Sequence, residues 1–222
     1  VIFVLLMIIF GIAYFSFNIG GRIGQHWDTP GISTGYIPVD FNSVSMKLCP
    51  SRLQPTLIYL ATYLNQGYYA LSMAFTLPWT PTMGAGSSVF IKINLLREIL
   101  GIDVARYTYQ GKMERAYGWI PGLNWPSIYV DLANDFHFIG VVFILFFLGI
   151  FFGEIVKDAI MQHQPLAIVL LCLLFIAFVY FPANNQIGMS GYTFVPFWAL
   201  SFFLVLVRAC SRNGRGIANQ TA

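Results

Sequence analysis

The sequence predicts an all-α polytopic membrane protein, with about four or five transmembrane helices in its 222 residues. Hydrophobic residues make up 57% of the chain and charged residues only 9%. In a soluble globular domain about a quarter of the residues are charged, so lipid must solvate much of this chain. In addition, several long apolar runs contain no charged side chain, and a long polar segment rich in aromatic residues separates them. We expect the chemistry of the protein to lie in that polar segment.

The apolar runs predict the membrane spans. A bilayer core of about 30 Å requires roughly 20 apolar residues in a helix. The runs that approach this length without an Asp, Glu, Lys or Arg are 1–17, 136–152, 166–181 and 192–207. A fifth candidate, 57–79, has the polar stretch 65–67 in its middle. We expect it either to cross the bilayer packed against protein or to re-enter as two half-helices.

The whole chain, 1–222, is expected to form a single membrane domain, because no repeat, low-complexity tract or linker divides it. It begins with Val and enters the run 1–17 at once, without a basic region or a small-residue cleavage site. We therefore expect the complete protein to have further residues before this sequence. The three cysteines are odd in number and widely spaced, which indicates neither a disulfide framework nor a metal site.

Basic residues predict the orientation of the spans, because cytoplasmic loops are enriched in Lys and Arg. Three arginines follow the last span, whereas the turn 182–191 has no Lys or Arg. We expect a cytoplasmic C-terminus, a cytoplasmic turn at 153–164 and an extracytoplasmic turn at 182–191. The long polar segment 80–135 is then extracytoplasmic. The side on which Arg22 lies depends on whether 57–79 crosses the membrane.

Within the polar segment, residues 89–100 have apolar positions at roughly helical spacing and end at Gly101. This pattern predicts an amphipathic helix at the membrane interface, with its cations among the lipid headgroups. The alternative is that cations of this region bind a diphosphate, since guanidinium groups match phosphate oxygens. The residues available for this are Lys92, Arg97, Arg106 and Arg115.

The glycine-rich run 84–88 lies directly before that helix and has two interpretations. Its backbone N–H groups would present an anion site at the helix N-terminus. Alternatively, it is a turn in which Ser87 or Ser88 caps the helix. We favour the second interpretation, because it requires no ligand.

The densest group of polar and aromatic residues is 119–135, directly before a predicted span. If the chain is helical after Pro126, Asp131 and Asp135 lie one turn apart on the same face. Two neighbouring carboxylates repel each other, which raises the pKa of at least one and suits a general base near neutral pH. The alternative is a helix N-terminus stabilised by Asp135, with the aromatic residues at the membrane interface.

Several classes of function are disfavoured. The net charge of +3 is small and the basic residues are scattered, so no nucleic-acid partner is expected. No Asp-x-Asp motif is present, so nothing visible requires a metal. The last three spans contain no charged residue at mid-membrane depth, whereas ion-coupled transporters usually have one there.

Three blocks of residues, taken in order, resemble a known family. They are 63–72 (YLNQGYYALS), 84–88 (GAGSS), and 125–129 (WPSIY) followed by 133–135 (AND) and Gly140. Their order resembles the C-terminal half of the Wzy-type O-antigen polymerases of bacterial envelopes, over roughly residues 60–153. At 86–88 the chain has Gly-Ser-Ser instead of the Gly-His-Ser expected there, so no histidine role is transferred.

The resemblance implies a metal-independent membrane glycosyltransferase without a cofactor, on the periplasmic side of the bacterial inner membrane. Such an enzyme transfers a growing glycan from undecaprenyl diphosphate to the non-reducing end of a new lipid-linked repeat unit. Its expected partners are the undecaprenyl-diphosphate-linked oligosaccharide, membrane lipid and a chain-length regulator protein.

The resemblance also implies roles for individual residues. The general base, or the group that orients the acceptor, is Asp135 or Asp131. The diphosphate contacts come from Arg97, Arg106, Arg115 or Lys92, and from Arg22 if its loop is extracytoplasmic. The aromatic surfaces for sugars are Trp119, Trp125 and Tyr129.

Other functions remain open at this stage. An O-antigen ligase shares the carrier lipid and the polytopic plan, and only the resemblance separates the two. A lipid-linked oligosaccharide flippase or transporter is expected to have charge in its spans. A membrane acyltransferase usually requires a catalytic histidine, and the chain offers His26, His137 and His163.

Overall fold

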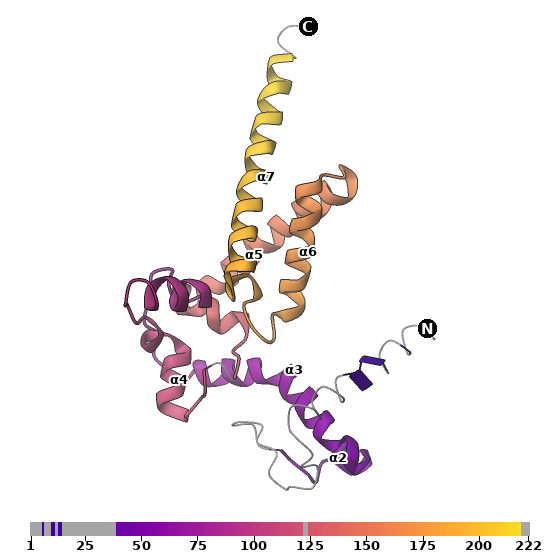
Figure 1. Ribbon diagram of the computed structural model, residues 1–222, viewed down its shortest axis with the longest axis vertical. Helices are drawn as coiled ribbons and strands as arrows, with labels where there is room; N and C mark the ends of the chain where they lie inside the picture. The colour runs from indigo at the N-terminus through magenta and orange to yellow at the C-terminus, as the bar shows by residue number, and fades with distance from the viewer. Residues whose placement is uncertain (1–5, 7–9, 12, 15–38, 122–123, 219–222) are drawn as a thin grey trace. The chain divides into compact units, whose positions relative to one another are not determined.

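The computed structural model describes residues 6, 10, 11, 13, 14, 39–121 and 124–218. The chain divides into two compact units, Val1–Gln66 and Gly67–Ala222. Every named element among the described residues is a helix (Figure 1). The predicted all-α class is therefore confirmed. The predicted span 1–17 lies largely outside the described residues.

The first unit contains the short helices α2 (Val44–Leu48) and η1 (Ser51–Leu53) and the larger part of α3 (Gln54–Ala74). Gln54 joins these helices, because its Nε2 donates to the carbonyl of Met46 at 3.1 Å. The helix α3 is continuous through 65–67, whereas two half-helices require a break there. It ends at Ala74 rather than at residue 79, and it is not among the helices apolar enough to cross a membrane.

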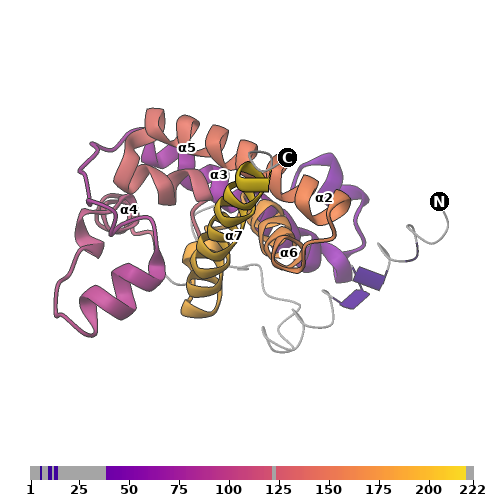
Figure 2. The same cartoon turned by 90° about the horizontal axis from the view of Figure 1, so that it is seen from above.

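Two described helices are long and apolar enough to cross a membrane: α5 (Ile128–Met161) and the Gly191–Ala209 part of α7 (Gly191–Ala218). Between them α6 (Pro165–Tyr180) is apolar but shorter. These helices support membrane association, and the full count of four or five spans stays a prediction. The helix α6 packs against both α5 and α7, and Figure 2 shows it beside α7. Their shared core includes the fully buried side chains Ile155, Leu170, Leu174 and Leu204.

The boundaries of α5 differ from the predicted ones at both ends. The helix begins at Ile128, which confirms the helix expected after Pro126, and its backbone is non-helical at His137, where φ is 56°. The predicted turn 153–164 is wrong in extent, because α5 continues to Met161. The polar residues there remain helical because their neighbours Ile155 and Ala159 are buried in the core shared with α6.

The polar segment contains the π-helix η2 (Phe90–Arg97), the short η3 (Ala105–Tyr107) and α4 (Tyr109–Tyr117). The helix predicted at 89–100 is thus present as a π-helix, which is shorter than the predicted range. Gly101 follows it with φ of 68°, as a glycine stop requires. The N-cap position of η2 is Val89, and the preceding Ser88 accepts with its Oγ from the backbone N–H of Ile91 at 3.3 Å, as a capping serine does. The helix α4 packs against the first turns of α5.

Candidate functional site

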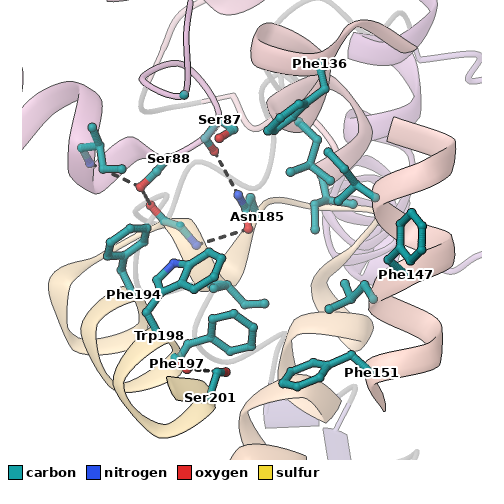
Figure 3. A pocket seen from close by; sticks show the side chains of 18 residues that line it. Ser87, Ser88, Phe136, Phe147, Phe151, Asn185, Phe194, Phe197, Trp198 and Ser201 are labelled. Carbon is teal, nitrogen blue, oxygen red and sulfur yellow. Dashed lines mark hydrogen bonds between the residues drawn. The ribbon is translucent and has the colours of Figure 1, made fainter. Parts of the chain in front are cut away.

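A cavity of about 610 Å³, which we call the α5–α7 groove, lies between α5 and α7 (Figure 3). Figure 3 shows aromatic side chains of α5, such as Phe147 and Phe151, on one side and those of α7, such as Phe197 and Trp198, on the other. None of the described residues that line the groove carries a charge. A volume of this size is within the usual range for a site that binds a small molecule, about 300–1,000 Å³.

One end of the groove is polar. It is formed by the turn 84–88 and by the loop 185–188 that precedes α7. The Nδ2 of Asn185 donates to the carbonyl of Ser87 at 2.9 Å, and the Oγ of Ser88 donates to the carbonyl of Gly188 at 2.9 Å (Figure 3). These bonds join two segments that are distant in sequence and make them one surface.

The turn 84–88, which forms part of this polar end, surrounds the carboxylate of Asp135. Its Oδ1 accepts from the hydroxyl of Thr82 at 2.5 Å and from the backbone N–H groups of Gly84 and Gly86 at 2.9 and 3.1 Å. Its Oδ2 accepts from the N–H of Ser87 at 2.8 Å. The N–H groups that would have bound an external anion are therefore occupied by an anion of the chain itself. The anion-site interpretation of 84–88 does not fit this geometry.

Glycine is required at position 86 because the turn lies directly against α5. A Cβ on Gly86 would lie 2.1 Å from Thr82 Oγ1 and 2.8 Å from Asn134 Cβ. The buried Asn134 side chain bonds this turn and α4 together. Its Oδ1 accepts from the N–H of Tyr109 at 2.7 Å, and its Nδ2 donates to the carbonyl of Gly86 at 3.3 Å.

The second carboxylate, Asp131, is buried one turn earlier in α5. It accepts from the Nε2 of Gln110 in α4 and from the backbone N–H of Asn185 at 3.2 Å. The predicted pairing of Asp131 and Asp135 on one side of the helix is thus realised in one polar cluster. Through Asn185 this cluster is directly connected to the groove.

The cation of this cluster is Lys92, which is only 6% exposed. Burial lowers the pKa of the Lys92 ammonium below its usual range, and the attraction of Asp131 and Asp135 opposes that effect. Its Nζ makes no hydrogen bond or ion pair with the residues described by the structure. Lys92 therefore acts on the two carboxylates through its charge at longer range.

The predicted arginine sites lie outside the groove. Arg97, Arg106 and Arg115 are exposed, and none of them lines it. Arg115 donates from Nη2 to the carbonyl of Arg106 at 2.7 Å, so the structure brings these two together. Arg22 lies outside the described residues. Within the described part of the chain no group of three His, Cys, Asp or Glu residues is arranged to hold a metal.

The three predicted sugar-stacking residues have different environments. Trp119 is 1% exposed and belongs to the core beneath α4 and α5, so its ring presents no face to a sugar in this structure. Trp125 and Tyr129 are partly buried, and the ring of Tyr129 lies edge-on to that of Phe181. Their stacking roles stay predictions.

Sequence reasoning missed both described residues that donate hydrogen bonds to the Asp131 carboxylate, Asn185 and Gln110. The available signal for Asn185 was a pair of asparagines inside an otherwise apolar C-terminal part of the chain. Gln110 had no comparable signal, because glutamine is ordinary in an exposed helix. Both bond to the same carboxylate, that of Asp131.

Comparisons of the chain with protein-family models, with curated proteins and with solved structures found no match. The chemistry of the site therefore has to follow from its own residues. The apolar walls suit a hydrocarbon chain, and the polar end suits a group that forms hydrogen bonds. The carboxylates behind that end are able to accept a proton or orient a hydroxyl.

Proposed function

We propose that this chain polymerises undecaprenyl-diphosphate-linked oligosaccharide repeat units into O-antigen or a related surface polysaccharide. The proposed location is the periplasmic side of the bacterial inner membrane. The observation that carries the proposal is the α5–α7 groove. Its walls are apolar where it lies between two helices that are long and apolar enough to cross a membrane, and its end beside the carboxylates of Asp131 and Asp135 is polar. A prenyl chain that carries a sugar head requires this combination of surfaces.

The contacts between distant blocks also support the proposal. Two of the blocks that carry the resemblance, 84–88 and 133–135, are bonded to each other through Asp135. The segments 80–135 and 182–191 were assigned to the same side of the membrane from their charges. The hydrogen bond between Asn185 and Ser87 joins these two segments, which supports a common side of the membrane for both.

In the proposed reaction the prenyl chain of the donor lies in the groove and its sugar head lies at the polar end. The acceptor hydroxyl oxygen bonds to the anomeric carbon of the donor glycan as the bond from that carbon to the diphosphate oxygen breaks. The hydroxyl proton goes to a carboxylate, and undecaprenyl diphosphate leaves. Arg97, Arg106 and Arg115 do not line the groove, so the diphosphate contacts that the resemblance implies for them stay predictions.

The proton acceptor in this proposal is Asp135 or Asp131. A carboxylate has about four acceptor positions. Within the described residues, Oδ2 of Asp135 receives one hydrogen bond and Oδ1 receives three. Oδ2 accepts fewer backbone hydrogen bonds than Oδ1, and in the proposal it is the oxygen that faces the acceptor hydroxyl beside Ser87. Asp131 reaches the groove only through Asn185.

The direct test uses purified protein in phospholipid vesicles with undecaprenyl-diphosphate-linked repeat units and no lipid A core. Polymerisation predicts longer lipid-linked glycans in this mixture. A ligase leaves the glycans unchanged because its acceptor is missing, and a flippase moves them across the bilayer without lengthening them. Either of these results would refute the proposal.

A matched pair of variants tests the groove itself. Ser201→Trp places a large ring among the groove-lining residues, and we expect it to abolish chain growth. Phe203→Trp makes a change on the exposed side of the same helix and is expected to retain activity. Equal activity of the two proteins, at equal amounts in the membrane, would exclude the groove from substrate binding.

A further inference from the structure

We infer that Arg208 and Asp158 are positioning residues that set the width of the α5–α7 groove. Arg208 donates from Nε to Oδ2 of Asp158 at 2.8 Å, and its Nη2 lies 2.6 Å from the same oxygen. The Nη2 group also donates to the carbonyl of Glu154 at 3.3 Å. The Asp158 side chain is almost fully buried, whereas the Arg208 side chain is 27% exposed.

Asp158 and Arg208 lie at the same distance along α5 and α7 from the last groove-lining residue of each helix. Phe151 is the last groove-lining residue of α5, and Ser201 is the last of α7. Asp158 and Arg208 each follow these residues by two helical turns, about 10 Å. The pair therefore joins α5 and α7 beyond the apolar end of the groove.

No other hydrogen bond joins α5 to α7 directly among the described residues. At the opposite, polar end the loop before α7 is bonded to α5 through Asn185 and Asp131. Between these two ends only apolar side chains face the cavity, apart from Ser201. Apolar contacts are not directional, so they do not define a separation between the walls as a charged hydrogen bond does.

Each wall also has a weak point near the polar end. The backbone of α5 is non-helical at His137, and α7 contains Pro196, which has no N–H to donate. Phe136 and Phe197, the neighbours of these residues, line the groove. The helices are thus able to bend near the polar end, and the ion pair opposes the separation of their far ends.

The consequence concerns how tightly the groove holds a chain. With the ion pair intact the walls keep one separation. Its loss leaves the buried Asp158 carboxylate with the hydrogen bond from Gln162 Nε2 at 3.1 Å and removes the charged link between α5 and α7. The identity of the bound chain as a prenyl group rests on the proposed function. The effect of the ion pair on the groove width does not.

The experiment measures that width directly with spin labels. Cysteines at Ile150 and Phe202, which are exposed and do not line the groove, carry the labels in a full-length protein whose natural cysteines are replaced. Pulsed electron paramagnetic resonance spectroscopy of the protein in phospholipid vesicles then reports the distance between the two labels, and so between the walls. Asp158→Asn and Arg208→Gln are expected to shift this distance upward and broaden its distribution.

Two controls distinguish a specific effect of the Arg208–Asp158 ion pair from a general loss of folding. Lys157→Gln changes an exposed charge on the same turn and is expected to keep the wild-type distance. The charge-exchanged protein with Asp158→Arg and Arg208→Asp is expected to restore it. If one of the single variants does not insert into the membrane, Arg208→Lys replaces it. This change keeps the positive charge but removes the guanidinium group, and it is expected to broaden the distance distribution less than Arg208→Gln does.

Wild-type distances in Asp158→Asn, Arg208→Gln or Arg208→Lys would overturn the inference. Failure of the charge-exchanged protein to restore the distance would overturn it as well. These readouts contain no glycan, so they remain valid if polymerisation is not found. Chain growth without any effect of the ion pair on the distance would refute the inference and leave the proposed function standing.

Discussion

The substitution Asp135→Asn is the most informative change at this site, because it alters the charge of one side chain and almost nothing of its shape. In the structure both carboxylate oxygens accept hydrogen bonds, and the donor opposite Oδ2 is the backbone N–H of Ser87. An amide retains one acceptor oxygen for Thr82, Gly84 and Gly86. Its NH2 group then faces the N–H of Ser87, donor against donor.

The cost follows from these contacts. Loss of a hydrogen bond to a charged group costs about 1.5–3 kcal/mol, and a donor left without a partner adds about 1–3 kcal/mol when buried. Because Ser87 is only partly buried, we expect a total of about 3 kcal/mol. For a protein of this size that corresponds to a fall in melting temperature of about 6–12 °C.

The assay is thermal unfolding in detergent, followed by tryptophan fluorescence, together with the vesicle polymerisation assay. Asp103→Asn is the matched control, because its carboxylate is exposed and accepts one backbone hydrogen bond, from Ala105 at 3.1 Å. An asparagine keeps that acceptor, so the control is expected to lose only a few tenths of a kcal/mol.

The two roles of Asp135 give different results. If the carboxylate holds the turn, Asp135→Asn loses stability and activity together. A variant with wild-type melting temperature and no activity would refute the structural reasoning and assign Asp135 to catalysis alone. A variant unchanged in both would remove Asp135 from the site.

Three further predictions concern the turn, the buried lysine and the topology. Gly86→Ala is expected to cost about 1–3 kcal/mol by overpacking against Thr82 and Asn134, whereas Gly149→Ala, with open space around it, is expected to be neutral or stabilising in the same melting assay. Burial lowers the pKa of Lys92 in the folded protein below its value of 10.5 in the unfolded chain. Between these two pKa values the unfolded chain binds more protons than the folded protein does, so the free energy of unfolding increases with pH. Unfolding measured from neutral pH upward should show that increase, at most about 1.4 kcal/mol per pH unit, in the wild type and not in Lys92→Met. A membrane-impermeant maleimide applied from outside is expected to label a cysteine at the exposed Met83 but not one at Lys157, and the reverse pattern would invert the proposed orientation.

Several features were predictable because their causes are local. The excess of apolar residues and the lack of charge in long runs predict helices solvated by lipid, and α5, α6 and α7 occupy those runs. The capping role of Ser88 and the stop at Gly101 follow from the backbone preferences of single residues. The helix after Pro126 belongs to the same group.

The helix ends were less predictable. The apolar run ends near residue 152, but α5 continues to Met161 because Ile155 and Ala159 are buried in the core it shares with α6. The interfacial pattern of 89–100 predicted an α-helix, whereas the chain forms a π-helix from Phe90 to Arg97. In both regions a neighbour in space, absent from the local pattern, decides the outcome.

The sequence by itself determined that the chain is helical, that the apolar runs 136–152, 166–181 and 192–207 lie in helices, and that the polar segment before α5 contributes to the candidate site. Only the tertiary structure decided that Asp135 is enclosed by the turn at 84–88, that Trp119 is buried, and that α5 and α7 enclose a groove. Composition and periodicity are properties of neighbours along the chain and are readable at once. The partners of a buried carboxylate or the width of a groove depend on segments 50 or more residues apart, and packing alone brings those together.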